Sequence, residues 1–229
     1  MKNSKRVLLA VFDRLLKSYG PRKWWPAKTR FEVIAGAILT QNVTWKNAKQ
    51  SIEALQSAGL LNHAAILKAR HDTIAAKIKS SRYYNQKTLK LKNFCSYLVD
   101  SYNGSLNKLF SQDLDKLRHE LLSIKGIGKE TADSILLYAG KKLSFVSDSY
   151  TKRFLTRYGI IDETAQYDDI RDFFMTNLPG DLYLYNEYHA LIVHHGYLTC
   201  KSKPGCSSCP IQKLNSEVYC KFSNAANKI

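Results

Sequence analysis

Four of the five cysteines lie near the C-terminus with a spacing that suits metal binding. They are Cys200, Cys206, Cys209 and Cys220. Four thiolates from one compact loop suit a [4Fe-4S] cluster, because each cysteine can bind one iron corner of the cube. A structural zinc site more often uses two CxxC pairs, and this loop contains only one. The fifth cysteine, Cys95, lies among apolar residues and is predicted to be a small core residue.

The string LLSIKGIGKETADSILLYA is a second stretch whose residue types could bind a ligand. Gly126 and Gly128 predict a tight turn between two helices, with backbone angles that other residues avoid. Because glycine lacks a side chain, the N–H groups of the turn and of the helix start at Thr131 can approach a phosphate. Lys125 and Lys129 flank the turn and would add positive charge. An ordinary linker between two helices is the alternative.

The composition favours a polyanionic partner. The chain has 229 residues, with 35 Lys and Arg against 19 Asp and Glu, a formal charge of +16 and a pI near 9.6. Such a charge is typical of nucleic-acid binding, although a membrane surface could attract it too. No stretch approaches the roughly 18 uninterrupted apolar residues of a transmembrane helix, so we expect no membrane partner.

The elements that would position these residues are helical. Residues 7–19 have apolar side chains at helical spacing, and 31–39 are apolar on nearly every face, which predicts a buried helix. Lys87, Lys90 and Lys92 lie in a later helix, and a charge run of this kind is usually a solvated face.

The hairpin string, followed by Asp148, resembles the helix-hairpin-helix DNA glycosylases of the endonuclease III superfamily, and the resemblance covers nearly the whole chain. Asp148 falls where that family carries its essential aspartate; structural N-capping of a helix is the alternative role, and both can hold together. The resemblance implies an all-α fold in two lobes with a cleft between them. We expect residues 22–134 to form a helical barrel that ends in the hairpin, and 1–21 with 135–229 to form the lobe that carries the cysteines.

The segment LTQNVTWKNAK resembles the place where endonuclease III relatives carry a glutamine that fills the gap left by an extruded base. Gln41 takes that position here; as a residue between two helices it could also be a cap or a solvent residue. The WWP loop, with Trp24 and Trp25, and the aromatic Trp45 resemble the 3-methyladenine DNA glycosylase III branch, in which such rings sandwich the damaged base. Sealing of the core is the alternative for these tryptophans.

Two features of the sequence depart from the pattern of the family. The cysteine loop resembles the endonuclease III cluster loop, but its first gap is one residue shorter and its last gap several residues longer. Relatives with lyase activity carry a nucleophilic lysine two residues past the second hairpin glycine, and Glu130 occupies that position. A carboxylate cannot form a Schiff base, so we expect weak or absent lyase activity.

Together these features predict a monofunctional base-excision glycosylase that flips and hydrolyses a damaged, 3-methyladenine-like base from double-stranded DNA. A glycosylase for oxidised pyrimidines or mismatched bases is one alternative, and a non-catalytic DNA-binding module is another. We expect a monomer in the cytoplasm, associated with the nucleoid, with reduced cysteines.

Overall fold

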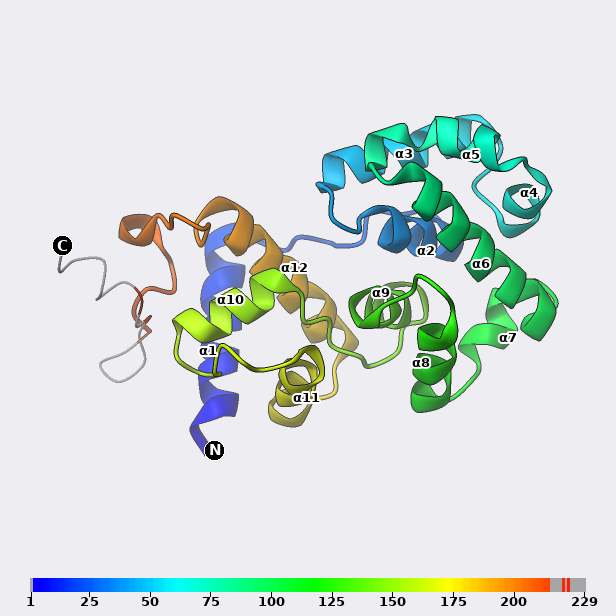
Figure 1. The fold of residues 1–229 in the computed structure, drawn as a ribbon. Helices are drawn as coiled ribbons and strands as arrows, with labels where there is room; N and C mark the ends of the chain where they lie inside the picture. The colour runs from blue at the N-terminus through cyan, green and yellow to red at the C-terminus, as the bar shows by residue number, and fades with distance from the viewer. Residues whose placement is uncertain (1, 215–219, 221, 223–229) are drawn as a thin grey trace. The chain divides into compact units, whose positions relative to one another are not determined.

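The computed structural model describes residues 2–214, 220 and 222, and the regular elements of this part are helical. The chain divides into two compact units (Figure 1). One unit consists of residues 25–142, and the other of residues 1–24 and 143–229. The sequence predicts boundaries at 22 and 134, and in the structure the second boundary lies later, at 142.

The unit of residues 25–142 contains most of the helices. They are α2 (Arg30–Leu39), α3 (Trp45–Ser57), α4 (His63–Lys68), α5 (His71–Lys77), α6 (Tyr84–Tyr102), α7 (Leu106–Phe110), α8 (Leu114–Ser123) and α9 (Lys129–Ser134), with the short segments η1 (Lys79–Ser81) and η2 (Ile135–Ala139). The helix α2 packs against α3, α6, α9 and η2. Because η2 packs on α2, it belongs to this unit, which explains the later boundary.

The central helix α2 begins at a side-chain cap and is buried along its length. Thr29 Oγ1 accepts a hydrogen bond from the backbone N–H of Glu32 at 3.1 Å, which satisfies one donor of the first turn. Every residue from Phe31 to Leu39 except Glu32 is buried. The prediction of a buried helix at 31–39 is therefore confirmed.

The hairpin joins α8 to α9 and is held by a buried ion pair. The guanidinium of Arg118 donates two hydrogen bonds to the carboxylate of Asp133, at 2.9 and 3.1 Å. Asp133 is fully buried, so loss of Arg118 would remove a charge-assisted hydrogen-bond donor from a carboxylate in the core and should be destabilising. After α9 the helix widens into the π-helical segment η2, where Gly140 N donates to Ile135 O. Such π segments are rare and often occur beside functional residues.

The other unit is built around one long helix. Its elements are α1 (Lys2–Tyr19), α10 (Ser149–Arg157), α11 (Tyr167–Asn177), α12 (Leu182–Leu198) and the short segment η3 (Cys206–Ser208). The helix α12 packs against α1 and α10, as Figure 1 shows. Its Tyr188 is fully buried and donates a hydrogen bond to Leu8 O at 2.8 Å, which ties α12 to α1.

In the part of the chain that the structure describes, every helix is too short or too polar to cross a bilayer.

Candidate functional site

The hairpin turn uses its two glycines differently. Gly126 has φ +100°, a conformation that other residues rarely adopt, whereas Gly128 has φ −94°. The prediction of unusual angles is therefore confirmed for Gly126 and wrong for Gly128. A Cβ on Gly128 would meet no atom within 4 Å, so the structure of the turn does not require glycine there. Ile127, between them, is buried and anchors the turn.

The flanking residues of the turn divide into exposed and buried ones. Lys125, Lys129 and Glu130 are exposed. Thr131 is 6% exposed, and its hydroxyl accepts a hydrogen bond from Gln41 Nε2 at 2.8 Å. Thr131 thus supports the turn from inside, while the two lysines extend from it.

Gln41 lies against this hairpin. Its Nε2 donates to Gly126 O at 3.2 Å as well as to Thr131, and its Oε1 accepts a hydrogen bond from Lys90 Nζ. The amide nitrogen of Gln41 is therefore bound to the hairpin and its oxygen to α6, unlike the amide of a freely solvated residue.

The lysine run of α6 turns inward, so the prediction of a solvated face is wrong. Lys87 is 1% exposed and donates to Leu39 O at 2.8 Å and to Ser81 O at 2.5 Å. Burial, together with the charge of Lys90, lowers the pKa of Lys87 to about 8. Carbonyls at helix ends attract a cation, because they are unsatisfied by the helix and carry its negative pole. The direction of these side chains depends on tertiary contacts, which the sequence alone does not show.

Three aromatic rings cluster on the same unit as the hairpin. Trp25 contacts Trp45 with ring centroids 5.3 Å apart and planes at 88°, and contacts Tyr138 of η2 at 5.3 Å and 59°. The Trp25 ring packs on α2, where an added Cβ on Gly36 would lie 2.9 Å from it. Trp25 and Trp45 thus meet edge to face, without a parallel gap between them. Trp24, the third predicted pocket residue, is half-buried and belongs to the other unit.

Asp148 is the N-cap of α10 and its side chain is 11% exposed. Its Oδ1 accepts hydrogen bonds from Thr151 N at 2.8 Å and Thr151 Oγ1 at 2.9 Å, so the predicted capping role is confirmed. Its Oδ2 lies 3.7 Å from His189 Nε2. Burial alone would raise the pKa of Asp148, but the nearby imidazole of His189, with the hydrogen bonds from Thr151, holds this pKa below its usual value. The carboxylate is therefore ionised at neutral pH.

His189 is the residue that sequence reasoning missed. It lies on α12, and its side chain is 9% exposed. The sequence shows only an imidazole within the apolar stretch 186–196, and this cannot indicate which carboxylate lies opposite.

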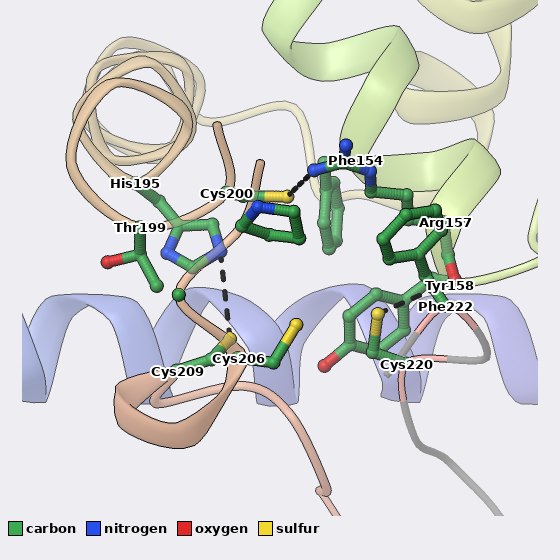
Figure 2. A pocket seen from close by; sticks show the side chains of 12 residues that line it. Phe154, Arg157, Tyr158, His195, Thr199, Cys200, Cys206, Cys209, Cys220 and Phe222 are labelled. Carbon is green, nitrogen blue, oxygen red and sulfur yellow. Dashed lines mark hydrogen bonds between the residues drawn. The ribbon is translucent and has the colours of Figure 1, made fainter. Parts of the chain in front are cut away.

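The four C-terminal cysteines come together around one cavity of the second unit, and Figure 2 shows their side chains lining it. None of them forms a disulfide. In the described ranges, no three His, Cys, Asp or Glu side chains are placed to hold a single metal ion. A cluster has a different requirement, because each thiolate binds a different iron and the sulfurs stay apart.

One thiol of this cavity is partly buried, and an arginine contacts another. Burial, and to a lesser degree the neighbouring thiols, raise the pKa of Cys209 to about 11. Thiols of this kind carry protons at neutral pH unless a cation compensates their charge. Arg157 holds the start of the loop by donating to Cys200 Sγ at 3.1 Å, Lys201 O at 2.6 Å and Ser202 O at 3.1 Å.

One histidine lies near one of these sulfurs. His195 Nε2 lies 3.9 Å from Cys209 Sγ, and its Nδ1 lies 2.9 Å from the hydroxyl of Tyr19 (Figure 2 shows the former contact). Burial, with the charges of His194 and Arg153, lowers the pKa of His195 to about 4. A neutral imidazole can donate one N–H and accept at its other nitrogen, as these two contacts require.

This fold and these sites define a class of protein. Residues 35–179 match the model of the HhH-GPD superfamily base excision DNA repair proteins, which is more than half of the chain. The chain therefore belongs to the HhH-GPD superfamily, as its sequence resemblance indicated, and is a DNA glycosylase of that superfamily.

Individual relatives agree with this assignment. The chain is 47% identical to a putative DNA repair glycosylase of Methanocaldococcus jannaschii, over 93% of this chain and 98% of that protein. It is 33% identical to endonuclease III of Sulfolobus acidocaldarius, over 85% and 84%. Among solved structures, it is similar to the H. pylori 3-methyladenine DNA glycosylase bound to 1,N6-ethenoadenine, with 29% identity, a TM-score of 0.74 and coverage of 85% of this chain and 97% of that one. An endonuclease III–DNA complex shares the fold at 19% identity, with a TM-score of 0.82 and coverage of 98% and 99%.

Proposed function

We propose that this glycosylase removes alkylated bases such as 3-methyladenine from double-stranded DNA by hydrolysis, without strand cleavage. The aromatic cluster of Trp25, Trp45 and Tyr138 carries the proposal, because it lies on the unit that bears the hairpin. N3-alkylated adenine is cationic, and indole faces attract cations by about 0.5 to 2 kcal/mol per contact. Within this cluster, Trp45 is the candidate for stacking against one face of such a base. The similar H. pylori enzyme is named for 3-methyladenine.

Asp148 is the proposed catalytic residue. As the bond between base and sugar breaks, positive charge develops on the sugar, and a nearby carboxylate stabilises it and can orient the attacking water. The lowered pKa keeps Asp148 ionised, while two hydrogen bonds from Thr151 fix its Oδ1. Oδ2 of Asp148 is then the oxygen that would stabilise the positive charge on the sugar.

The remaining predicted residues would contact the DNA duplex. An enzyme that acts on a stacked base must rotate it out of the helix, and contacts to phosphates and to the vacated space offset this cost. Gly126, Gly128, Lys125 and Lys129 would bind the backbone, and Gln41 would fill the gap. The formal charge of +16 favours this partner.

We also propose a [4Fe-4S] cluster bound by Cys200, Cys206, Cys209 and Cys220. The four thiols around one cavity support this donor set. When bound, the cluster would hold the loop in shape, while Arg157 fixes its first residues. It supplies no step of the hydrolysis.

Excision from a panel of duplexes with single lesions tests the substrate. Trp45→Ala should lower 3-methyladenine release by about tenfold or more, because stacking of a base on an aromatic ring is worth about 1 to 3 kcal/mol. Trp45→Phe, which keeps an aromatic face, is the matched control and should retain most of the activity. Binding to undamaged duplex should change little in both variants.

A specific observation keeps an alternative substrate open, since the chain is 33% identical to an endonuclease III. Efficient release of an oxidised pyrimidine such as thymine glycol, with no release of methylated bases, would support that alternative and contradict our proposal.

The absence of strand cleavage is tested by borohydride trapping. Because Glu130 stands at the position of the lyase lysine, the protein should form no covalent adduct with DNA under reducing conditions. Glu130→Lys is the matched variant and should gain some trapping. Strong trapping by the natural chain, lost in Lys129→Ala, would show that the neighbouring lysine acts as the nucleophile.

A further inference from the structure

Both ends of the Gln41 amide are engaged, and a lysine engages the oxygen. Lys90 Nζ donates to Gln41 Oε1, while Gln41 Nε2 donates to Gly126 O at 3.2 Å and Thr131 Oγ1 at 2.8 Å. Lys90 comes from α6, 49 residues away from Gln41 in the sequence.

The chemistry of these partners fixes the orientation of the amide. An ammonium group can only donate hydrogen bonds, and a backbone carbonyl can only accept them. The oxygen of Gln41 must therefore face Lys90, and its nitrogen must face Gly126. An amide rotated by half a turn would place N–H groups against the ammonium and its oxygen against the carbonyl of Gly126. The usual ambiguity between amide oxygen and nitrogen does not arise here.

The backbone of the hairpin makes room for this lysine. A Cβ on Gly126 would clash with Cγ of Lys90, whose aliphatic stem lies over the turn. The position of the Lys90 side chain therefore depends on Gly126, the same glycine that has the unusual φ. One side chain thus contacts the hairpin through its stem and Gln41 through its ammonium.

We propose that Lys90 is a positioning residue that presets Gln41 for insertion into the duplex. The inference rests on the proposed gap-filling function of Gln41 and goes beyond it, because it assigns a role to a lysine outside the family motif. Immobilising a flexible glutamine only when DNA arrives would cost conformational entropy at that moment. A glutamine already held by Lys90, Gly126 and Thr131 has lost that freedom in the unbound protein.

The first test measures the contact without DNA. Lys90→Met keeps an unbranched apolar side chain, one atom shorter than that of lysine, and removes the donor. Lys92→Met is the matched control: it removes the same charge from the same helix, but Lys92 Nζ donates to Leu67 O and Ala69 O instead. In 1H–15N spectra, the side-chain amide signals of Gln41 should shift in Lys90→Met and stay in place in Lys92→Met. Unchanged Gln41 signals in Lys90→Met would overturn the inference, whatever the activity.

The second test measures the consequence for excision. Single-turnover release from a fully paired duplex should fall about threefold to tenfold in Lys90→Met, with little change in duplex affinity. Lys90→Arg keeps a donor and should restore most of the rate. The loss should shrink when the lesion is mispaired, because less energy is then needed to extrude it. In the Gln41→Ala background, Lys90→Met should have no further effect.

Two outcomes separate this inference from its premises. If Lys90→Met slows release equally in the presence and absence of Gln41 and lowers the salt dependence of binding by about one phosphate contact, Lys90 binds DNA directly and the inference is wrong. If the Gln41 signals shift but neither Gln41→Ala nor Lys90→Met changes the release rate, the contact exists and the gap-filling function is wrong.

Discussion

At the scale of single residues, Asp148 and His189 form the pair with the clearest consequence for activity. The nearby imidazole of His189 and the hydrogen bonds from Thr151 oppose the effect of burial and hold the pKa of Asp148 below its usual value. Only the ionised carboxylate can stabilise positive charge on the sugar, so activity should fall as the pH drops through this pKa. Given the proposed catalytic role of Asp148, His189 should widen the pH range of activity on the acid side.

Replacing His189 should narrow that range. In His189→Gln the pKa of Asp148 should rise, and the acid limb of the rate profile should move upward by about one pH unit, as expected when an opposite charge at this distance is lost. His194→Gln changes the same residue type on the same helix away from Asp148 and should leave the limb in place. The measurement is single-turnover release between pH 3.5 and 8, with Asp148→Asn as the inactive reference. An unmoved limb in His189→Gln would contradict the role of this histidine.

At the scale of elements, the hairpin separates two uses of glycine. Gly126 is needed to fold the turn, because its φ is +100° and its missing Cβ leaves room for Lys90. Gly128 is free of both constraints, with φ −94° and open space where a Cβ would lie. A glycine that the fold does not need is consistent with close approach of a ligand.

Two alanine variants test this separation. Gly126→Ala should lower the free energy of unfolding by about 1 to 3 kcal/mol, the usual cost of such strain. Gly128→Ala should leave stability nearly unchanged but weaken binding to undamaged duplex several-fold, because its methyl group would keep a phosphate away from the N–H groups of the turn. Thermal unfolding and a binding titration at fixed salt measure the two effects. Full affinity in Gly128→Ala would contradict a phosphate contact at this turn.

At the scale of the whole molecule, the cysteine loop determines whether the chain carries iron. Protein purified anaerobically should be brown and contain about four irons per chain. Cys206→Ala should lose iron and unfold at lower temperature, since the cluster's proposed role is to hold the loop. Cys95→Ala is the matched control: Cys95 is fully buried in α6 of the other unit, so this variant should keep its iron. Colourless protein with one zinc per chain would refute the cluster, and a stable, iron-loaded Cys206→Ala protein would refute this ligand.

The sequence by itself determined the features that depend on neighbouring residues. The helical fold, the hairpin turn, the N-cap at Asp148 and the clustered cysteines follow from local patterns, because caps, turns and helix faces are made within a few residues. The same patterns indicated the HhH-GPD superfamily, to which the chain belongs. The boundary expected at residue 134 differs from the one at 142 in the structure, because its position depends on the packing of η2 against α2.

Only the tertiary structure decided which distant side chains meet. It placed His189 beside Asp148, turned Lys87 and Lys90 inward, and set Trp25 edge to face with Trp45. Direction and partner of a long or aromatic side chain depend on the packing of helices far apart in the sequence. The same run of lysines in a sequence is compatible with ammonium groups that reach water and with ammonium groups that donate to carbonyls at a helix end. The neighbouring elements of the fold decide between the two.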